Sequence, residues 1–154
     1  MSYKAPEGGA KFGLGAQPVV QGLEAASQSY TAGAPLKWVA GLLTECTNAG
    51  DIATQIAASL FAGIASAPAS GVANTRQLFV PYETLTNSVM TVFTTEITAL
   101  AQTNVGAEVD LAKDGTTGFW YVDKTASASD NVKIMALVDA VGETDFGKVE
   151  VLFL

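Results

Sequence analysis

Four carboxylates lie close together along the last third of the chain, at Glu108, Asp110, Asp114 and Asp123. Clusters of carboxylate oxygens can bind calcium, and a suitably spaced pair can hydrolyse a glycosidic bond. This spacing matches no known calcium loop, and nothing specifies sugar-binding aromatic residues beside the acids. We therefore expect the carboxylates to solvate the edge of a hairpin, and we predict no metal ligands.

Other reactive groups are few. The chain has no histidine, which removes the commonest general base and the commonest metal ligand. Serine and threonine are abundant, but no base stands at a spacing that would activate them. Gly13-Leu-Gly15 is too short for a dinucleotide fingerprint, and the single cysteine, Cys46, is expected to be a small buried apolar residue. We predict no catalytic and no cofactor-binding residues, and thus a non-enzymatic protein.

The elements that carry these residues read as short strands. Asp114-Gly115 stands between two β-rich runs and predicts a hairpin, because glycine tolerates the positive φ that such turns need. Apolar residues recur at every second position at Val132, Ile134, Ala136 and Val138, and again at Val149, Val151 and Phe153. A period of two is typical of half-buried strands.

The middle of the chain continues this pattern. Strands are predicted over residues 36–40, 42–47, 59–66, 76–80 and 89–100. Residues 51–58 favour a short helix that Asp51 could cap, and residues 82–87 are expected to be a connection. We therefore predict an all-β fold, an antiparallel β-barrel or β-sandwich, with an extended N-terminal arm and at most a short helix near residues 51–58.

Residues 1–22 are predicted to form the arm and residues 23–154 a β-rich domain, with a possible subdivision near 100–106. The first segment is rich in glycine and proline and carries few apolar residues, so it cannot pack by itself. Two interpretations remain open: a disordered tail, or an arm whose anchors Tyr3, Phe12 and Leu14 dock on a neighbouring subunit. No fixed-period repeat is visible.

Charge is unevenly distributed. The formal net charge is −7, which makes nucleic acid an unexpected partner. Neither a signal peptide nor a membrane span is predicted, because no apolar run is long enough. Between Phe12 and Val105 there are two bases and five acids in 94 residues, whereas ordinary domains carry charge at about a quarter of their positions. Either a Ser/Thr/Ala surface keeps this region soluble, or another protein covers it.

Six segments follow one another in a distinctive order: Ser27–Leu36, Gly41–Leu43, Phe61–Ala65, Val105–Leu111, Phe119–Asp123 and Gly142–Phe153. They include a Y-x-x-G-x-P strand entry, a central A-G-I-A strand and a closing G-x-V-x-V-x-F strand. In this order the chain resembles the small decoration, or cement, proteins that bind the outside of tailed-phage capsids.

The resemblance implies a virion protein on the capsid exterior. Its partners would be the major capsid protein and copies of itself, as a dimer or trimer, with neither nucleic acid nor membrane involved. Trp38, on a predicted strand, is expected to fill a core or an interface, and joins Tyr3, Phe12 and Leu14 as a candidate partner-binding residue.

Two other functions remain open. Aromatic residues at Trp38, Trp120 and Tyr121 would suit a carbohydrate-binding β-sandwich if they are exposed, although adjacent strand residues such as Trp120 and Tyr121 face opposite ways. A small hydrolase using Asp110 and Asp123 is the third possibility.

Overall fold

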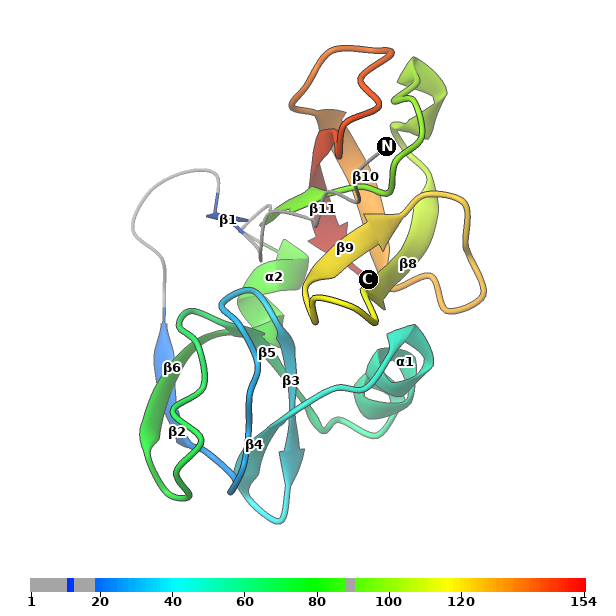
Figure 1. Ribbon diagram of the computed structural model, residues 1–154. Helices are drawn as coiled ribbons and strands as arrows, with labels where there is room; N and C mark the ends of the chain where they lie inside the picture. Colours follow the sequence, from blue (N-terminus) through cyan, green and yellow to red (C-terminus); the bar gives the residue numbers. More distant parts are fainter. Residues whose placement is uncertain (1–10, 13–18, 88–90) are drawn as a thin grey trace.

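The computed structural model describes residues 11–12, 19–87 and 91–154, and these residues build two antiparallel sheets (Figure 1). The five-stranded sheet has the order β2-β6-β5-β3-β4, formed by β2 (Val20–Leu23), β6 (Arg76–Pro81), β5 (Phe61–Ala65), β3 (Pro35–Val39) and β4 (Leu42–Glu45). The six-stranded sheet has the order β1-β7-β11-β10-β8-β9, formed by β1 (Lys11–Phe12), β7 (Thr91–Thr94), β11 (Lys148–Phe153), β10 (Val132–Leu137), β8 (Glu108–Lys113) and β9 (Trp120–Asp123). The predicted all-β class is confirmed.

Each sheet curls until its outer strands meet. The start and end of the five-stranded sheet join at one parallel bridge, Glu24↔Leu43. Strands β7 and β9 join at a second parallel bridge, Thr95↔Val122. We call strands β2–β6 the first barrel and strands β7–β11 the second barrel. In Figure 1 they lie one below the other, with α2 between them.

The two barrels have the same topology. Strands β2, β6, β5, β3 and β4 correspond in order to β7, β11, β10, β8 and β9. The ladders also correspond pair for pair: Val20↔Phe79 with Thr91↔Val151, Ile64↔Val80 with Lys133↔Leu152, Leu36↔Gly63 with Val109↔Val132, and Lys37↔Thr44 with Asp110↔Asp123. Equal order and equal register mean equal strand stagger, the property that sets a barrel's shape.

This duplication explains why no fixed period is visible in the sequence. Equivalent residues at the closing bridges are 71 positions apart at Glu24 and Thr95 but 79 apart at Leu43 and Val122. Loops of unequal length therefore shift the two copies against one another. The predicted subdivision near residues 100–106 falls inside the second barrel, between β7 and β8.

Aromatic residues join the barrels into one core. Phe61 of the first barrel stacks on Phe153 of the second, with ring centroids 5.9 Å apart, and Phe153 also contacts Phe93. The Tyr82 hydroxyl donates to the Leu154 carbonyl at 2.6 Å. Burying this apolar surface supplies most of the stabilisation.

Two α-helices lie within the described residues. The predicted short helix is confirmed as α1 (Ala49–Ala57), but Asn48 caps it by accepting a hydrogen bond from the Asp51 backbone. The expectation that Asp51 is the cap is wrong. Helix α2 (Tyr82–Asn87) forms where only a connection was expected, so one short helix was too few. Neither helix is long and apolar enough to cross a membrane.

Two local details differ from the predicted pattern. The β8–β9 hairpin is confirmed, but its positive φ falls at Gly118 (φ 76°) and not at Gly115. The Asp114 carboxylate accepts a hydrogen bond from the Thr117 backbone N–H, and the Asp114 carbonyl accepts one from the Gly118 N–H. In β10 an irregularity between Ile134 and Ala136 breaks the alternation, so the side chain of Val138 is exposed.

Candidate functional site

A groove of about 470 Å³ opens at one end of the first barrel. Its lining comes from β2, β3, the end of α1, β5, β6 and α2: Val20, Trp38, Ile56, Ser59, Phe61, Ala62, Phe79, Pro81, Tyr82 and Glu83. We call this the aromatic groove. Mostly apolar walls with a few polar groups are typical of binding sites.

Two edge-to-face pairs fix the aromatic walls. Trp38 meets Phe79 with ring centroids 5.7 Å apart and planes at 81°. Phe61 meets Tyr82 at 5.4 Å and 84°. Such pairs contribute about 0.5–1.5 kcal/mol beyond simple burial. The groove is therefore held open by rings that brace one another.

A glycine lets Trp38 occupy this position. A Cβ atom on Gly22 would lie 2.9 Å from Trp38 Cη2 and 2.7 Å from Leu43 Cδ1. Both distances are shorter than side chains tolerate, so the indole rests where a larger residue on β2 would stand. Trp38 was expected to fill a core or an interface. It is half-buried and packs against the hydrophobic core, and its role in binding a partner stays a prediction.

The polar groups of the groove are already engaged in part. The Tyr82 hydroxyl donates to Leu154, and burial raises the pKa of Tyr82 above its ordinary value. Glu83 supplies the one carboxylate of the lining. The groove thus presents aromatic rings and one charged side chain at its rim, which can bind an apolar or aromatic group.

The few charges of the first two-thirds are mostly turned inward. Lys37 pairs with Asp51 at 2.8 Å, and Glu45 pairs with Lys113 at 3.0 Å while accepting from the Trp120 indole at 2.9 Å. Five of the seven charged residues between Phe12 and Val105 are buried or ion-paired in this way: Glu24, Lys37, Glu45, Asp51 and Glu96. The other two, Arg76 and Glu83, are exposed.

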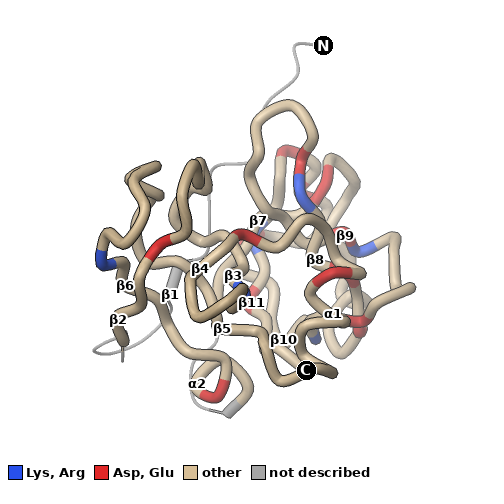
Figure 2. Tube along the Cα trace, turned by 90° about the horizontal axis from the view of Figure 1, so that it is seen from below, with Lys and Arg blue, Asp and Glu red and all other residues tan. Residues whose placement is uncertain are grey.

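The surface of the first barrel is therefore poorer in charge than its sequence suggests. Charged positions are sparse along the trace around β2, β4 and β6 (Figure 2). Apolar side chains are exposed on the same barrel, at Val20, Leu23, Val39, Leu60, Val72 and Leu78. Surfaces depleted of charge and enriched in apolar groups are typical of protein interfaces.

Glu24 is fully buried and ties the first barrel together. Its carboxylate accepts hydrogen bonds from the backbone N–H groups of Ser70 and Gly71, at 3.0 and 2.8 Å, and from the Gln77 amide at 2.8 Å. Burial alone would raise the pKa of Glu24, but these hydrogen bonds outweigh it and the pKa is lowered. The group is structural, because it closes the barrel beside its parallel bridge.

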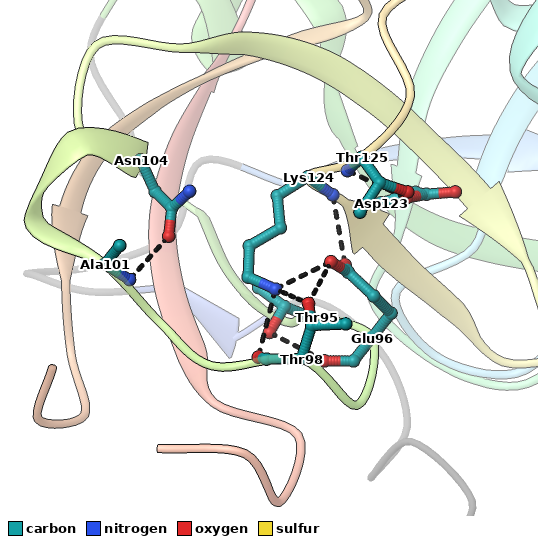
Figure 3. A network of polar contacts seen from close by, with 8 residues as sticks. All are labelled: Thr95, Glu96, Thr98, Ala101, Asn104, Asp123, Lys124 and Thr125. Carbon is teal, nitrogen blue, oxygen red and sulfur yellow. Dashed lines mark hydrogen bonds and ion pairs between the residues drawn. The ribbon is translucent and has the colours of Figure 1, made fainter. Parts of the chain in front are cut away.

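The second barrel carries a comparable network at its own bridge (Figure 3). Lys124 Nζ, whose side chain is 4% exposed, pairs with Glu96 at 2.6 Å and donates to the Thr98 carbonyl at 3.0 Å and to the Thr98 hydroxyl. The Lys124 backbone N–H donates to the other Glu96 oxygen at 3.0 Å. Lys124 and Glu96 thus connect the loop after β7 to the end of β9.

Two of the four carboxylates of the last third, Asp110 and Asp123, lie opposite one another on β8 and β9. Asp110 accepts from the backbone N–H groups of residues 129 and 130, and Asp123 accepts from Thr125. Asp114 is engaged with Thr117 inside its turn. Among the described residues no three His, Cys, Asp or Glu side chains gather as metal ligands. Asp114 and Asp123 thus stabilise their own turns, and Asp110 holds the loop before β10.

The other residues predicted to bind a partner belong to the N-terminal arm. Tyr3 and Leu14 lie outside the described residues, and Phe12 lies in β1, where only its backbone pairing with Thr91 is described. Within the predicted arm, residues 11–12 and 20–22 belong to strands β1 and β2.

Trp120 is 1% exposed, so the expectation of an exposed aromatic there is wrong, whereas Tyr121 is half-buried. Cys46 is buried as predicted, and burial raises its pKa to about 12.

Sequence reasoning missed most of the groove. Phe61, Phe79 and Tyr82 come from three elements and meet only in the folded barrel. A usable signal was an aromatic residue near one end of each of three strands, at Trp38 in β3, Phe61 in β5 and Phe79 in β6. Comparisons of the chain with protein families, with curated proteins and with solved structures find no match.

Proposed function

We propose that this chain is a non-enzymatic structural protein that binds the outer surface of an assembled viral capsid and stabilises it. The observation that carries the proposal is the surface of the first barrel, where charge is turned inward and apolar side chains face outward. A protein that binds only the assembled shell stabilises it by mass action, and many copies add their effects. No turnover is needed.

The aromatic groove is the anchor of this proposal. Trp38 and Tyr82 both line the groove, and each packs edge-to-face against a phenylalanine. Aromatic anchors in partly desolvated pockets dominate the energy of many interfaces. The arm, with Tyr3, Phe12 and Leu14, is proposed to contact a neighbouring subunit.

Co-sedimentation with capsids assembled without decoration tests the proposal. Wild-type protein should bind at a fixed copy number, and Trp38→Ala should weaken binding about 30-fold, the equivalent of roughly 2 kcal/mol. The matched control is Val141→Ala, an exposed apolar residue of the second barrel, which should leave affinity unchanged. Wild-type protein that stays in the supernatant would contradict the proposal.

A carbohydrate-binding module is the second candidate, because the aromatic groove could also stack against sugar rings. The burial of Trp120 removes one of the residues that favoured it. A glycan array separates the two: a specific hit that Trp38→Ala abolishes would favour sugar binding. An empty array combined with capsid co-sedimentation would favour the first proposal.

A further inference from the structure

Each barrel leaves part of its first strand unpaired by its own strands. The closing bridges fall at the ends of β2 and β7, at Glu24 and Thr95. Residues before each bridge pair with β6 or β11 on one side. Their other side faces away from the barrel's own strands, so each barrel has one short open edge. Open edges readily accept another strand.

In the second barrel this edge is filled by the chain itself. Strand β1 pairs antiparallel with β7, with Lys11 opposite Val92 and Phe12 opposite Thr91. The equivalent residues of the first barrel are Gln21 and Val20, because Val20↔Phe79 corresponds to Thr91↔Val151. Among the residues that the structure describes, none pairs with this edge of β2.

The open edge of β2 adjoins the aromatic groove. Val20 is 42% exposed and is part of the groove lining. A residue paired opposite Val20 would lie on the same face as Val20, since directly opposed residues share a face. Its side chain would therefore be directed towards the groove. An aromatic residue at that position would match the rings of Trp38 and Phe79.

We propose that the β2 edge binds the Lys11–Phe12 segment of a second copy of this chain, antiparallel, with Phe12 opposite Val20 and Lys11 opposite Gln21. The same segment already pairs in this register with the equivalent edge of β7. Moving it to a second copy frees the β7 edge of its own chain, replaces one set of strand hydrogen bonds by another and adds the groove contact. As in domain swapping, an element of one copy is donated to another, here to the β2 edge and not to β7.

Chain length limits the geometry of a reciprocal exchange. Residues 13–19 connect Phe12 to Val20, and an extended connection of that length spans at most about 25 Å. The two β2 edges of the dimer must lie within that reach. The inference goes beyond capsid binding, because Phe12 of a second copy and a capsid side chain would compete for the same groove. It is tested on the isolated protein without capsids, so its failure would leave the proposed function standing.

Cysteine cross-linking tests the register. The variants Lys11→Cys and Gln21→Cys are mixed and mildly oxidised, because directly opposed residues have Cα atoms about 4.5–5.5 Å apart, within disulfide range. We expect a covalent heterodimer to form at least about tenfold faster than for Lys11→Cys mixed with Val141→Cys, since docking raises the effective concentration. Equal rates in the two mixtures would overturn the proposal.

A second variant keeps the test independent of disulfide chemistry between copies. The double variant Lys11→Cys/Val92→Cys locks β1 onto its own β7 when oxidised, following the observed pairing. Sedimentation should show dimers for the reduced double variant and monomers after oxidation. Dimers that survive oxidation, or a wild-type protein that stays monomeric at every concentration reached, would contradict strand donation.

Discussion

The two barrels share one strand order and one register but differ in what covers them. The first strand of the second barrel is covered by β1, and charged residues are frequent around that barrel. The first strand of the first barrel has no such cover among the described residues, and most of the charges of that half are paired or buried. One architecture thus carries a half rich in exposed charge and a half poor in it. The difference lies in the surface residues and in the added strand β1, and not in the order of the five barrel strands.

Substituting the two tryptophans should give the largest difference in stability between the two barrels. Trp120 is buried in the second barrel with its indole N–H on Glu45, so Trp120→Ala should cost about 3–5 kcal/mol of unfolding free energy. Trp38 is half-buried in the groove, and Trp38→Ala should cost clearly less. Urea unfolding followed by circular dichroism measures both. Equal losses would mean that Trp38 is an ordinary core residue.

Gly63 should be the most sensitive backbone position of the first barrel. Its φ is +147°, and a Cβ atom would lie 1.9 Å from the Val80 carbonyl oxygen. Gly63→Ala should therefore cost about 3 kcal/mol, combining backbone strain with overpacking. The matched control is Gly41→Ala, where φ is +79° but nothing lies within 4 Å, and about 1 kcal/mol is expected. Similar losses in thermal unfolding would contradict this account.

The closing bridges are held by different chemistry, and substitution should reveal it. Glu24→Gln replaces one carboxylate oxygen by a donor facing other donors, and should cost about 1–3 kcal/mol. Its counterpart Thr95 donates one hydrogen bond, to the Glu96 carbonyl at 3.3 Å, so Thr95→Val should cost less than about 1 kcal/mol. Denaturant midpoints compare the two. A larger loss of unfolding free energy for Thr95→Val than for Glu24→Gln would contradict this account.

Acid should affect the first barrel through its buried carboxylates. Burial raises the pKa of Glu24 and of Asp51, but hydrogen bonds outweigh it, and both values fall below the ordinary 4.5 and 3.8. Their contribution is therefore complete above those values and is lost as the pH falls through the folded-state pKa. Unfolding free energy measured against pH should decline in acid, less steeply in Glu24→Gln. If the unfolding free energy of Glu24→Gln falls with pH as steeply as that of the wild type, Glu24 does not contribute to the loss of stability in acid.

At alkaline pH the free energy of unfolding should instead fall as the pH rises. Burial, aided by the charges of Glu24 and Glu45, raises the pKa of Tyr30 from 10.0 to about 12. Burial, together with nearby Asp51, raises the pKa of Cys46 from 9.0 to about 12. The stability that depends on their neutral forms is complete below the ordinary values and is lost as pH rises towards 12. Cys46→Ala should shift the onset of this loss upwards.

Local patterns were sufficient for most strands and for the fold class. Val149, Val151 and Phe153 alternate and are all buried in β11, and the strands over residues 36–40 and 76–80 form as β3 and β6. A strand needs only a period of two and a break at each end, and both are written in neighbouring residues. Helix α2 was missed because six residues carry too weak a periodicity to be distinguished from a loop.

The arrangement of those strands depended on distant residues. Glu45 finds Lys113 and Trp120, 68 and 75 positions away, and Phe61 finds Phe153 across the two barrels. No local rule specifies such partners, because closing a barrel depends on register and stagger between strands. The sequence by itself therefore determined an all-β chain poor in charge over its first two-thirds. Only the tertiary structure decided that the chain folds as two matching barrels, that the charges pair inward, and that no described residue pairs with the β2 edge beside the aromatic groove.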